Sequence, residues 1–300
     1  MGEYLSNLSI LVLLKKIKFN LTTNIPHATM SYPAQLCEVM TGPMPNYHSP
    51  ATMEDLVEYM AERGVSPALV THGVRITSRQ FAEAGTVLDL SKLQLDEIKI
   101  ESNIVHIGGQ AVLQDLIESP HLQKIANGIL PQACSFAAHL GLRHVSTLGG
   151  VILSTEGAAE IRLVLMALDA SVVVLNTAIN TLSLSEYRPR NGDVVLEVLI
   201  NRWDENYHGA LTRVARTPLD EAIVAVAALI NPEGQRVAVS GVGEEPLFVS
   251  ANATLTVEEV AEKVMAEARP VADYRGSAEY RRAMAGVLTK RALQAAHGRN

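Results

Sequence analysis

The feature that most constrains this 300-residue chain is the pair of adjacent glycines at Gly149 and Gly150. They follow Ser146, Thr147 and Leu148 and come shortly before residues 158–170, whose apolar side chains recur at helical spacing. Because glycine carries no side chain, paired glycines ahead of a helix let backbone amides approach a bound phosphate closely. Taken alone, the pair is either an ordinary turn or part of a phosphate-binding loop, and only the neighbouring segments can distinguish these two readings.

The composition indicates a folded protein with no electrostatic reason to bind nucleic acid. Hydrophobic residues make up 48% of the chain and charged residues 19%, which suffices for two or three domains with their own cores. The formal net charge is −7, and Lys and Arg form no dense run, so no nucleic-acid partner is expected. The apolar run at residues 8–14 is shorter than the roughly 20 residues that a membrane span needs, so no membrane span is expected either.

The sequence also gives no reason to expect a metal site or a catalytic side chain. Its cysteines, Cys37 and Cys134, form no CxxC pattern, and the histidines are scattered singly, which disfavours a disulfide framework, a zinc site and an iron–sulfur site. Any metal centre would therefore belong to a partner. Asp220 and Glu221 are adjacent carboxylates, but neighbouring residues on a strand point to opposite faces, so they do not form a catalytic pair.

The order of elements predicts a first α+β unit that covers residues 43–202, after an uncertain N-terminal extension at residues 1–42. The spacing of apolar and turn residues predicts helices at 53–63, 111–119, 122–126, 131–140 and 158–170, and strands at 68–70, 87–90, 98–100, 104–107, 171–175 and 194–200. The two strands at 98–107 are separated by three residues, which is typical of a hairpin.

The last hundred residues predict a second α+β unit, residues 203–300. Residues 231–234 form a strong turn signal between two antiparallel strands, and Thr256 with Glu259 forms a capping box at the start of a helix. A final helix is expected from Ser277 to about Ala296. Its basic residues indicate either a solvated face or a contact with another subunit, and they are Arg281, Arg282, Lys290 and Arg291.

Five segments occur in an order that is typical of one protein family. They are Tyr47-His48-Ser49-Pro50, Ile107-Gly108-Gly109, Leu142-Arg143-His144 with Thr147-Leu148-Gly149-Gly150, the ungapped spacing from there to Leu168-Asp169-Ala170, and the run from Asp273 to Arg282 with Lys290-Arg291-Ala292-Leu293. In this order they resemble the FAD-binding medium subunit of molybdenum hydroxylases, the carbon monoxide dehydrogenase and xanthine dehydrogenase type of flavoprotein. The resemblance covers residues 43–297.

The resemblance implies a PCMH-type FAD-binding fold of two α+β subdomains, followed by a C-terminal α+β domain with an antiparallel sheet and helices. It also implies that the FAD pyrophosphate lies in two glycine-containing loops and that an acidic residue lies near the cofactor. Carried over one by one, these positions are Thr71, His72, Gly73, Val74 and Arg75 in the first loop, Thr147, Leu148, Gly149, Gly150 and Val151 in the second loop, and Glu160 as the acidic residue. The resemblance implies no catalytic side chain.

Several of these positions depart from the family pattern. His72 stands where the family has a glycine, Val151 replaces an asparagine, Glu160 replaces an aspartate, and Arg162 replaces a proline. Fewer convergent polar groups weaken the binding of a dinucleotide. FAD binding is therefore the expectation, and a flavin-free subunit with a structural or docking role is the alternative.

The function implied by the resemblance is electron transfer by an oxidoreductase subunit. Electrons from the iron–sulfur clusters of a partner would pass through the flavin to an acceptor such as a quinone, NAD or oxygen. The implied partners are a large molybdopterin-binding subunit and a small iron–sulfur subunit, in a cytoplasmic complex. An unrelated nucleotide-binding enzyme is disfavoured because neither GxGxxG after the first strand nor GxxxxGK[ST] is present.

Overall fold

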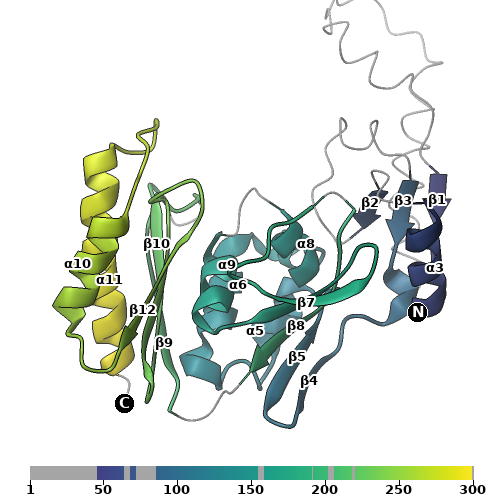
Figure 1. The fold of residues 1–300 in the computed structure, drawn as a ribbon, viewed down its shortest axis with the longest axis horizontal. Coiled ribbons are helices and arrows are strands. Elements are labelled where there is room, and N and C mark those ends of the chain that lie inside the picture. The colour runs from purple at the N-terminus through teal and green to yellow at the C-terminus, as the bar shows by residue number, and fades with distance from the viewer. Residues whose placement is uncertain are drawn as a thin grey trace, which may run out of the picture. The chain divides into compact units, whose positions relative to one another are not determined.

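The computed structural model describes residues 46–63, 68–71, 86–154, 159–190, 192–201, 206–217 and 220–298. In these ranges the strands form three sheets, of three, five and four strands (Figure 1). The N-terminal extension expected at residues 1–42 lies outside the described residues. No helix in the described ranges is long and apolar enough to cross a membrane.

A small parallel sheet comes first. Its strands are β1 (Asn46–His48), β2 (Ala68–Thr71) and β3 (Thr86–Asp89), and β3 lies between the other two. The helix predicted at residues 53–63 is confirmed as α3 (Met53–Arg63). Its apolar face belongs to a buried cluster with the second sheet, and this cluster contains Leu56, Met60, Leu88, Leu90, Leu175, Val194 and Leu196.

The second sheet is antiparallel and has the order β4-β5-β8-β6-β7. Its strands are β4 (Ile98–Glu101), β5 (Ile104–Gly108), β6 (Ser171–Leu175), β7 (Ile179–Ser183) and β8 (Val194–Asn201). The predicted hairpin is confirmed. Ser102 and Asn103 turn it with φ of 49° and 65°, the positive values that a two-residue hairpin turn of this hand requires.

The helices between these strands share one core with the sheet. They are α5 (Leu113–Glu118), α6 (Ile129–Ala137), α7 (Leu140–Arg143), α8 (Leu148–Leu153) and α9 (Ala159–Ala167). The prediction of a helix at residues 122–126 is wrong. The 3₁₀ segment η2 (Ile125–Gly128) lies there, and Ala126, Asn127 and Gly128 all have positive φ, which reverses the chain before α6 begins.

The third sheet is also antiparallel and lies between two groups of helices (Figure 1). Its strands are β9 (His208–Val214), β10 (Val224–Asn231), β11 (Gly234–Ser240) and β12 (Leu247–Asn252), in the order β12-β11-β10-β9. One face packs on α10 (Val257–Glu267) and α11 (Ala278–His297), and the other face packs on α9. The predicted strand pair, capping box and final helix are confirmed, and so is the α+β fold class.

Candidate cofactor-binding site

The paired glycines lie inside a short helix that the sequence did not predict. Thr147 is the N-cap of α8, and its Oγ1 accepts a hydrogen bond from the Gly150 N–H at 3.2 Å. Leu148, Gly149 and Gly150 form the first turn of this helix and are buried. The hydroxyl cap explains why a helix begins here although glycine is a weak helix former.

Gly149 is required because another backbone segment lies against it. A Cβ at this position would come within 2.7 Å of the Gly109 carbonyl oxygen, closer than real Cβ contacts allow. The Gly149 N–H donates to that same oxygen at 2.8 Å, and the Leu148 N–H donates to the Ala111 carbonyl at 2.9 Å. The glycine segments at 108–109 and 149–150, which lie far apart in sequence, therefore form one compact backbone unit.

Gly109 joins this unit to the end of the second sheet. A Cβ at Gly109 would come within 2.1 Å of the Val195 carbonyl oxygen, and the Gly109 N–H donates to the Leu196 carbonyl at 2.8 Å. A glycine is therefore needed at residue 109, against the Val195 carbonyl, as well as at residue 149, against the Gly109 carbonyl. The sheet, the segment at 108–111 and the start of α8 are held together by backbone contacts that no larger side chain would permit.

The amide groups of the second loop already have acceptors within the protein. Besides the bonds of Leu148, Gly149 and Gly150, the Val151 N–H donates to the Thr147 carbonyl at 3.1 Å. The Val151 side chain packs against the main hydrophobic core, which explains an apolar residue at this position. Gly149 and Gly150 carry no side chains that would keep a cofactor away, so this part of the loop fits the family's cofactor. The loop amides, however, would have to share their hydrogen bonds between the acceptors within the protein and a bound pyrophosphate.

Only the first residue of the other predicted loop is described. Thr71 ends β2, and in the register of the parallel sheet it pairs with Asp89 of β3. His72, Gly73, Val74 and Arg75 lie outside the described residues, so their predicted contact with the cofactor stays a prediction. Asp89 accepts a hydrogen bond from the Tyr47 hydroxyl, and burial together with this carboxylate raises the pKa of Tyr47 to about 12.

Glu160 forms an ion pair with Arg213. The Arg213 Nε lies 3.2 Å from Glu160 Oε1, and both side chains are nearly inaccessible to solvent. Burial raises the pKa of the Glu160 carboxyl, and the Arg213 charge acts in the opposite direction. The Arg213 guanidinium also lies 5.0 Å from the centre of the Phe136 ring. These contacts join α9 and the end of α6 to β9, and the predicted proximity of Glu160 to the cofactor stays a prediction.

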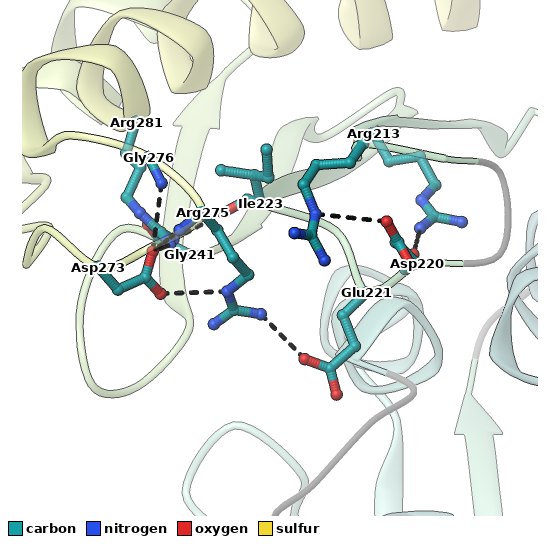
Figure 2. Close-up of polar contacts among 10 residues, drawn as sticks. Arg213, Asp220, Glu221, Ile223, Gly241, Asp273, Arg275, Gly276 and Arg281 are labelled. Carbon is teal, nitrogen blue, oxygen red and sulfur yellow. Dashed lines mark hydrogen bonds and ion pairs between the residues drawn. The ribbon is translucent and has the colours of Figure 1, made fainter.

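The C-terminal sequence signature forms a polar network that the sequence did not predict (Figure 2). Arg281 donates to Asp273 Oδ1 at 2.6 Å and to the carbonyls of Ile223 and Gly241 at 2.9 and 3.2 Å. Arg275 lies between two carboxylates, at 3.1 Å from Asp273 and 2.9 Å from Glu221. The hydrogen bond from Arg281 holds the pKa of Asp273 well below its usual range.

This network corrects one interpretation of the basic residues on the last helix. Arg281 is only 4% exposed, so it belongs neither to a solvated face nor to an accessible contact surface. Its neighbour Arg282 is exposed, as the sequence analysis expected. The spacing could not distinguish the two, because the carbonyl acceptors of Arg281 lie far away in sequence, just before β10 and just after β11.

The described ranges contain no group of three or more His, Cys, Asp or Glu side chains that could hold a metal ion. Cys134 is fully buried in α6, and burial raises the pKa of its thiol to about 12. Its thiolate is therefore not formed near neutral pH.

The fold is that of a known class of protein. Residues 40–199 match the family described as the FAD binding domain in molybdopterin dehydrogenase, and residues 210–296 match the CO dehydrogenase flavoprotein C-terminal domain. The chain therefore belongs to the FAD-binding medium subunits of molybdenum hydroxylases, which are oxidoreductase subunits. The family recognised from the sequence is confirmed.

Individual relatives extend this assignment over most of the chain. The carbon monoxide dehydrogenase medium chain of Hydrogenophaga pseudoflava is 25% identical over 87% of this chain and 99% of its own length. The YgfM protein of Escherichia coli K12 is 30% identical over 67% of this chain and 76% of its own length.

Solved structures show the same fold. A carbon monoxide dehydrogenase structure from Hydrogenophaga pseudoflava aligns with a TM-score of 0.75 at 24% identity, covering 86% of this chain and 99% of that chain. Quinoline 2-oxidoreductase from Pseudomonas putida 86 aligns with a TM-score of 0.73 at 22% identity over the same shares of the two chains.

Proposed function

We propose that this chain is the FAD-carrying electron-transfer subunit of a molybdenum hydroxylase complex. It receives electrons from the iron–sulfur clusters of a small partner subunit and passes them to an acceptor, while a large molybdopterin-binding subunit oxidises the substrate. The proposal places the complex in the cytoplasm. The observation that carries it is the family match over both halves of the chain.

We infer that the FAD pyrophosphate is held by two segments of the first unit. These are Thr71, His72, Gly73, Val74 and Arg75, and Thr147, Leu148, Gly149, Gly150 and Val151. When bound, FAD supplies a redox group that exchanges electrons with one-electron and two-electron partners. The glycines of the second segment carry no side chains that would keep the pyrophosphate away. Because the amides of that segment already have acceptors, the first segment provides the additional hydrogen-bond donors.

The protein's own contribution is to bind and orient. The ion pair between Glu160 and Arg213 joins α9 to β9. The protein's part in cofactor chemistry is to position the redox group relative to the group with which it exchanges electrons. We infer that the buried ion pair serves this positional role.

The direct experiment is to purify the full chain, record its visible spectrum and titrate it with FAD. We expect a flavin spectrum, or saturable binding of added FAD, from a folded protein. Gly73→Val should weaken FAD binding at least about tenfold without changing the circular dichroism, because a side chain would enter the first loop. Failure of the folded wild-type chain to bind FAD would refute the proposal.

One observation favours the alternative of a flavin-free docking subunit. Every amide from Leu148 to Val151 has an acceptor within the protein, and His72 occupies a glycine position of the family. This alternative predicts a stable subunit that assembles with its partners and contains no flavin. The same titration, performed on the assembled complex, separates the two functions.

A further inference from the structure

A polar cleft lies at the opposite end of β5 and β8 from the glycine loop. In the register of these strands Ile104 pairs with Asn201, and both line the cleft, whereas Gly108 pairs with Glu197 at the other end. The cleft has a volume of about 440 Å³, within the range of roughly 300–1,000 Å³ that is typical of small-molecule sites. None of its described lining residues belongs to the predicted FAD loops.

Charges of both signs face this cleft. The Nη1 of Arg236, on β11, lies 3.2 Å from the Oδ2 of Asp169, just after α9, and the two side chains are 24% and 63% exposed. Glu233, in the turn between β10 and β11, also lines the cleft. Because an ion pair that is open to solvent contributes little stability, a ligand can replace either partner at low cost.

The turns that carry these groups have ordered backbones. Asp169 has a φ of 56°, which aspartate tolerates, and its amide donates to the Met166 carbonyl at 3.1 Å. The Glu233 amide donates to the side-chain oxygen of Asn231 at 3.0 Å. Asn103 lies in the hairpin turn between β4 and β5. Binding groups that are already held in place lose less entropy when a ligand binds.

Neutral polar groups complete the lining. The amides of Asn103 and Asn201 each offer hydrogen-bond donors and an acceptor, and Tyr207 offers a hydroxyl and an aromatic face. Among the lining residues that the structure describes, Ile104 alone is aliphatic. The cleft therefore suits a small polar ligand rather than an apolar one.

We propose that this cleft binds a free amino acid in its zwitterionic form. The carboxylate of the ligand lies on the Arg236 guanidinium, which can offer it two parallel hydrogen bonds, and the ammonium lies on Asp169 and Glu233. An anion would meet two carboxylates, and a neutral sugar would have to open the ion pair without offering a charge to either partner. The inference goes beyond the proposed function and does not depend on FAD.

The first test is isothermal titration calorimetry of the full chain with each protein amino acid in turn. We expect saturable binding of at least one of them, and a higher melting temperature in its presence, because the ligand binds the folded chain. If no amino acid binds the folded chain, the inference is wrong.

Two variants locate the bound amino acid. Arg236→Met removes the cation of the cleft and Glu233→Gln neutralises a carboxylate, so each should raise the dissociation constant at least about tenfold. The matched controls are Arg282→Met and Glu262→Gln, exposed residues of the helices on the face of the third sheet opposite α9, and they should bind like the wild type. Circular dichroism checks that all four variants are folded. Binding that neither cleft variant weakens would place the site elsewhere and overturn the inference.

Analogues of the bound amino acid separate recognition of its charges from a structural effect of the variants. The amine that lacks the carboxylate should bind the wild type at least about tenfold more weakly, and Arg236→Met should not weaken it further. The acid that lacks the amino group should also bind more weakly but stay sensitive to Arg236→Met. Analogues that bind as tightly as the parent amino acid would contradict recognition of a zwitterion.

FAD titration of Arg236→Met keeps this inference apart from the proposed function. The variant should bind FAD like the wild type, and loss of FAD binding together with amino-acid binding would count against a separate site. A wild-type chain that binds no flavin would defeat the proposed function and leave the amino-acid measurements unaffected.

Discussion

At the scale of single residues, Gly149 shows how a sequence pattern for phosphate binding can also be a packing requirement. Its missing Cβ allows a hydrogen bond to the Gly109 carbonyl, and this contact is made entirely by the protein's own backbone. The pair of glycines therefore has a structural role that would persist in a flavin-free homologue. For this reason the glycines support the fold more directly than they support the cofactor.

Gly149→Ala should destabilise the protein by about 1–3 kcal/mol, because the new Cβ would lie 2.7 Å from a backbone oxygen. Urea unfolding measures this change. Gly141→Ala is the matched control, since its Cβ would meet only His139 side-chain atoms at 3.6 Å or more. The control should unfold like the wild type or slightly later. Equal destabilisation by the two variants would contradict the packing argument.

Arg281 gives a second prediction at this scale. Arg281→Leu removes the donor to two buried carbonyls and to Asp273, so it should lower the free energy of unfolding by on the order of 3 kcal/mol. Arg282→Leu changes the adjacent exposed residue and should stay within about 0.5 kcal/mol of the wild type. Thermal or urea unfolding of the two variants compares them directly, and similar stabilities would show that the network contributes little.

Asp273 makes the same network sensitive to acid. Its folded-state pKa is lowered, mainly by the hydrogen bond from Arg281, so its contribution to stability is present at neutral pH. That contribution should decline as the pH falls below about 3.9, the ordinary pKa of an aspartate, toward its folded pKa. Asp273→Asn should therefore differ most from the wild type near neutral pH and least in strong acid. A difference that does not change with pH would indicate that the carboxylate charge is unimportant.

At the scale of elements, the ion pair between α9 and β9 also predicts a dependence of stability on pH. Arg213→Met leaves the buried Glu160 without its cation and should destabilise the protein by on the order of 3 kcal/mol at pH 7. Because burial raises the Glu160 pKa, the folded state takes up a proton at this carboxyl more readily than the unfolded chain does, and the deficit should shrink as the pH is lowered. The double variant with Glu160→Gln should be more stable than Arg213→Met at pH 7. If it is not, the two residues do not act as a pair.

Elements with local signals were predictable from the sequence. The hairpin at residues 98–108 follows from alternation around two turn residues, and α10 follows from the reciprocal hydrogen bonds of Thr256 and Glu259. α8 was missed because two glycines argue against a helix, whereas the Thr147 cap and the contacts with residues 109–111 stabilise it. β7 was missed because its residues are largely exposed and show no buried alternation.

The residues of the candidate site were predictable only where the sequence resembles the motifs of the family. The motif singled out Gly149 and Gly150 as a pyrophosphate loop, which stays a prediction, and it gave no sign of their backbone contact with residue 109. It could not reveal that Glu160 pairs with Arg213, because that contact depends on how β9 lies against α9. The acceptors of Arg281 come from segments 40 and 58 residues away, and spacing in the sequence carries no information about such contacts.

At the scale of the whole molecule, FAD binding and stability have to be linked. If FAD binds only the folded chain, a concentration of 100 times its dissociation constant stabilises that chain by about 2.7 kcal/mol. For a protein of this size each kcal/mol corresponds to roughly 2–4 °C, so the melting temperature should rise by about 5–10 °C. Riboflavin lacks the pyrophosphate and should give a smaller shift at the same concentration if the glycine-containing loops bind that group. Equal shifts would place the binding energy at the ring, and no shift with either ligand would identify a flavin-free subunit.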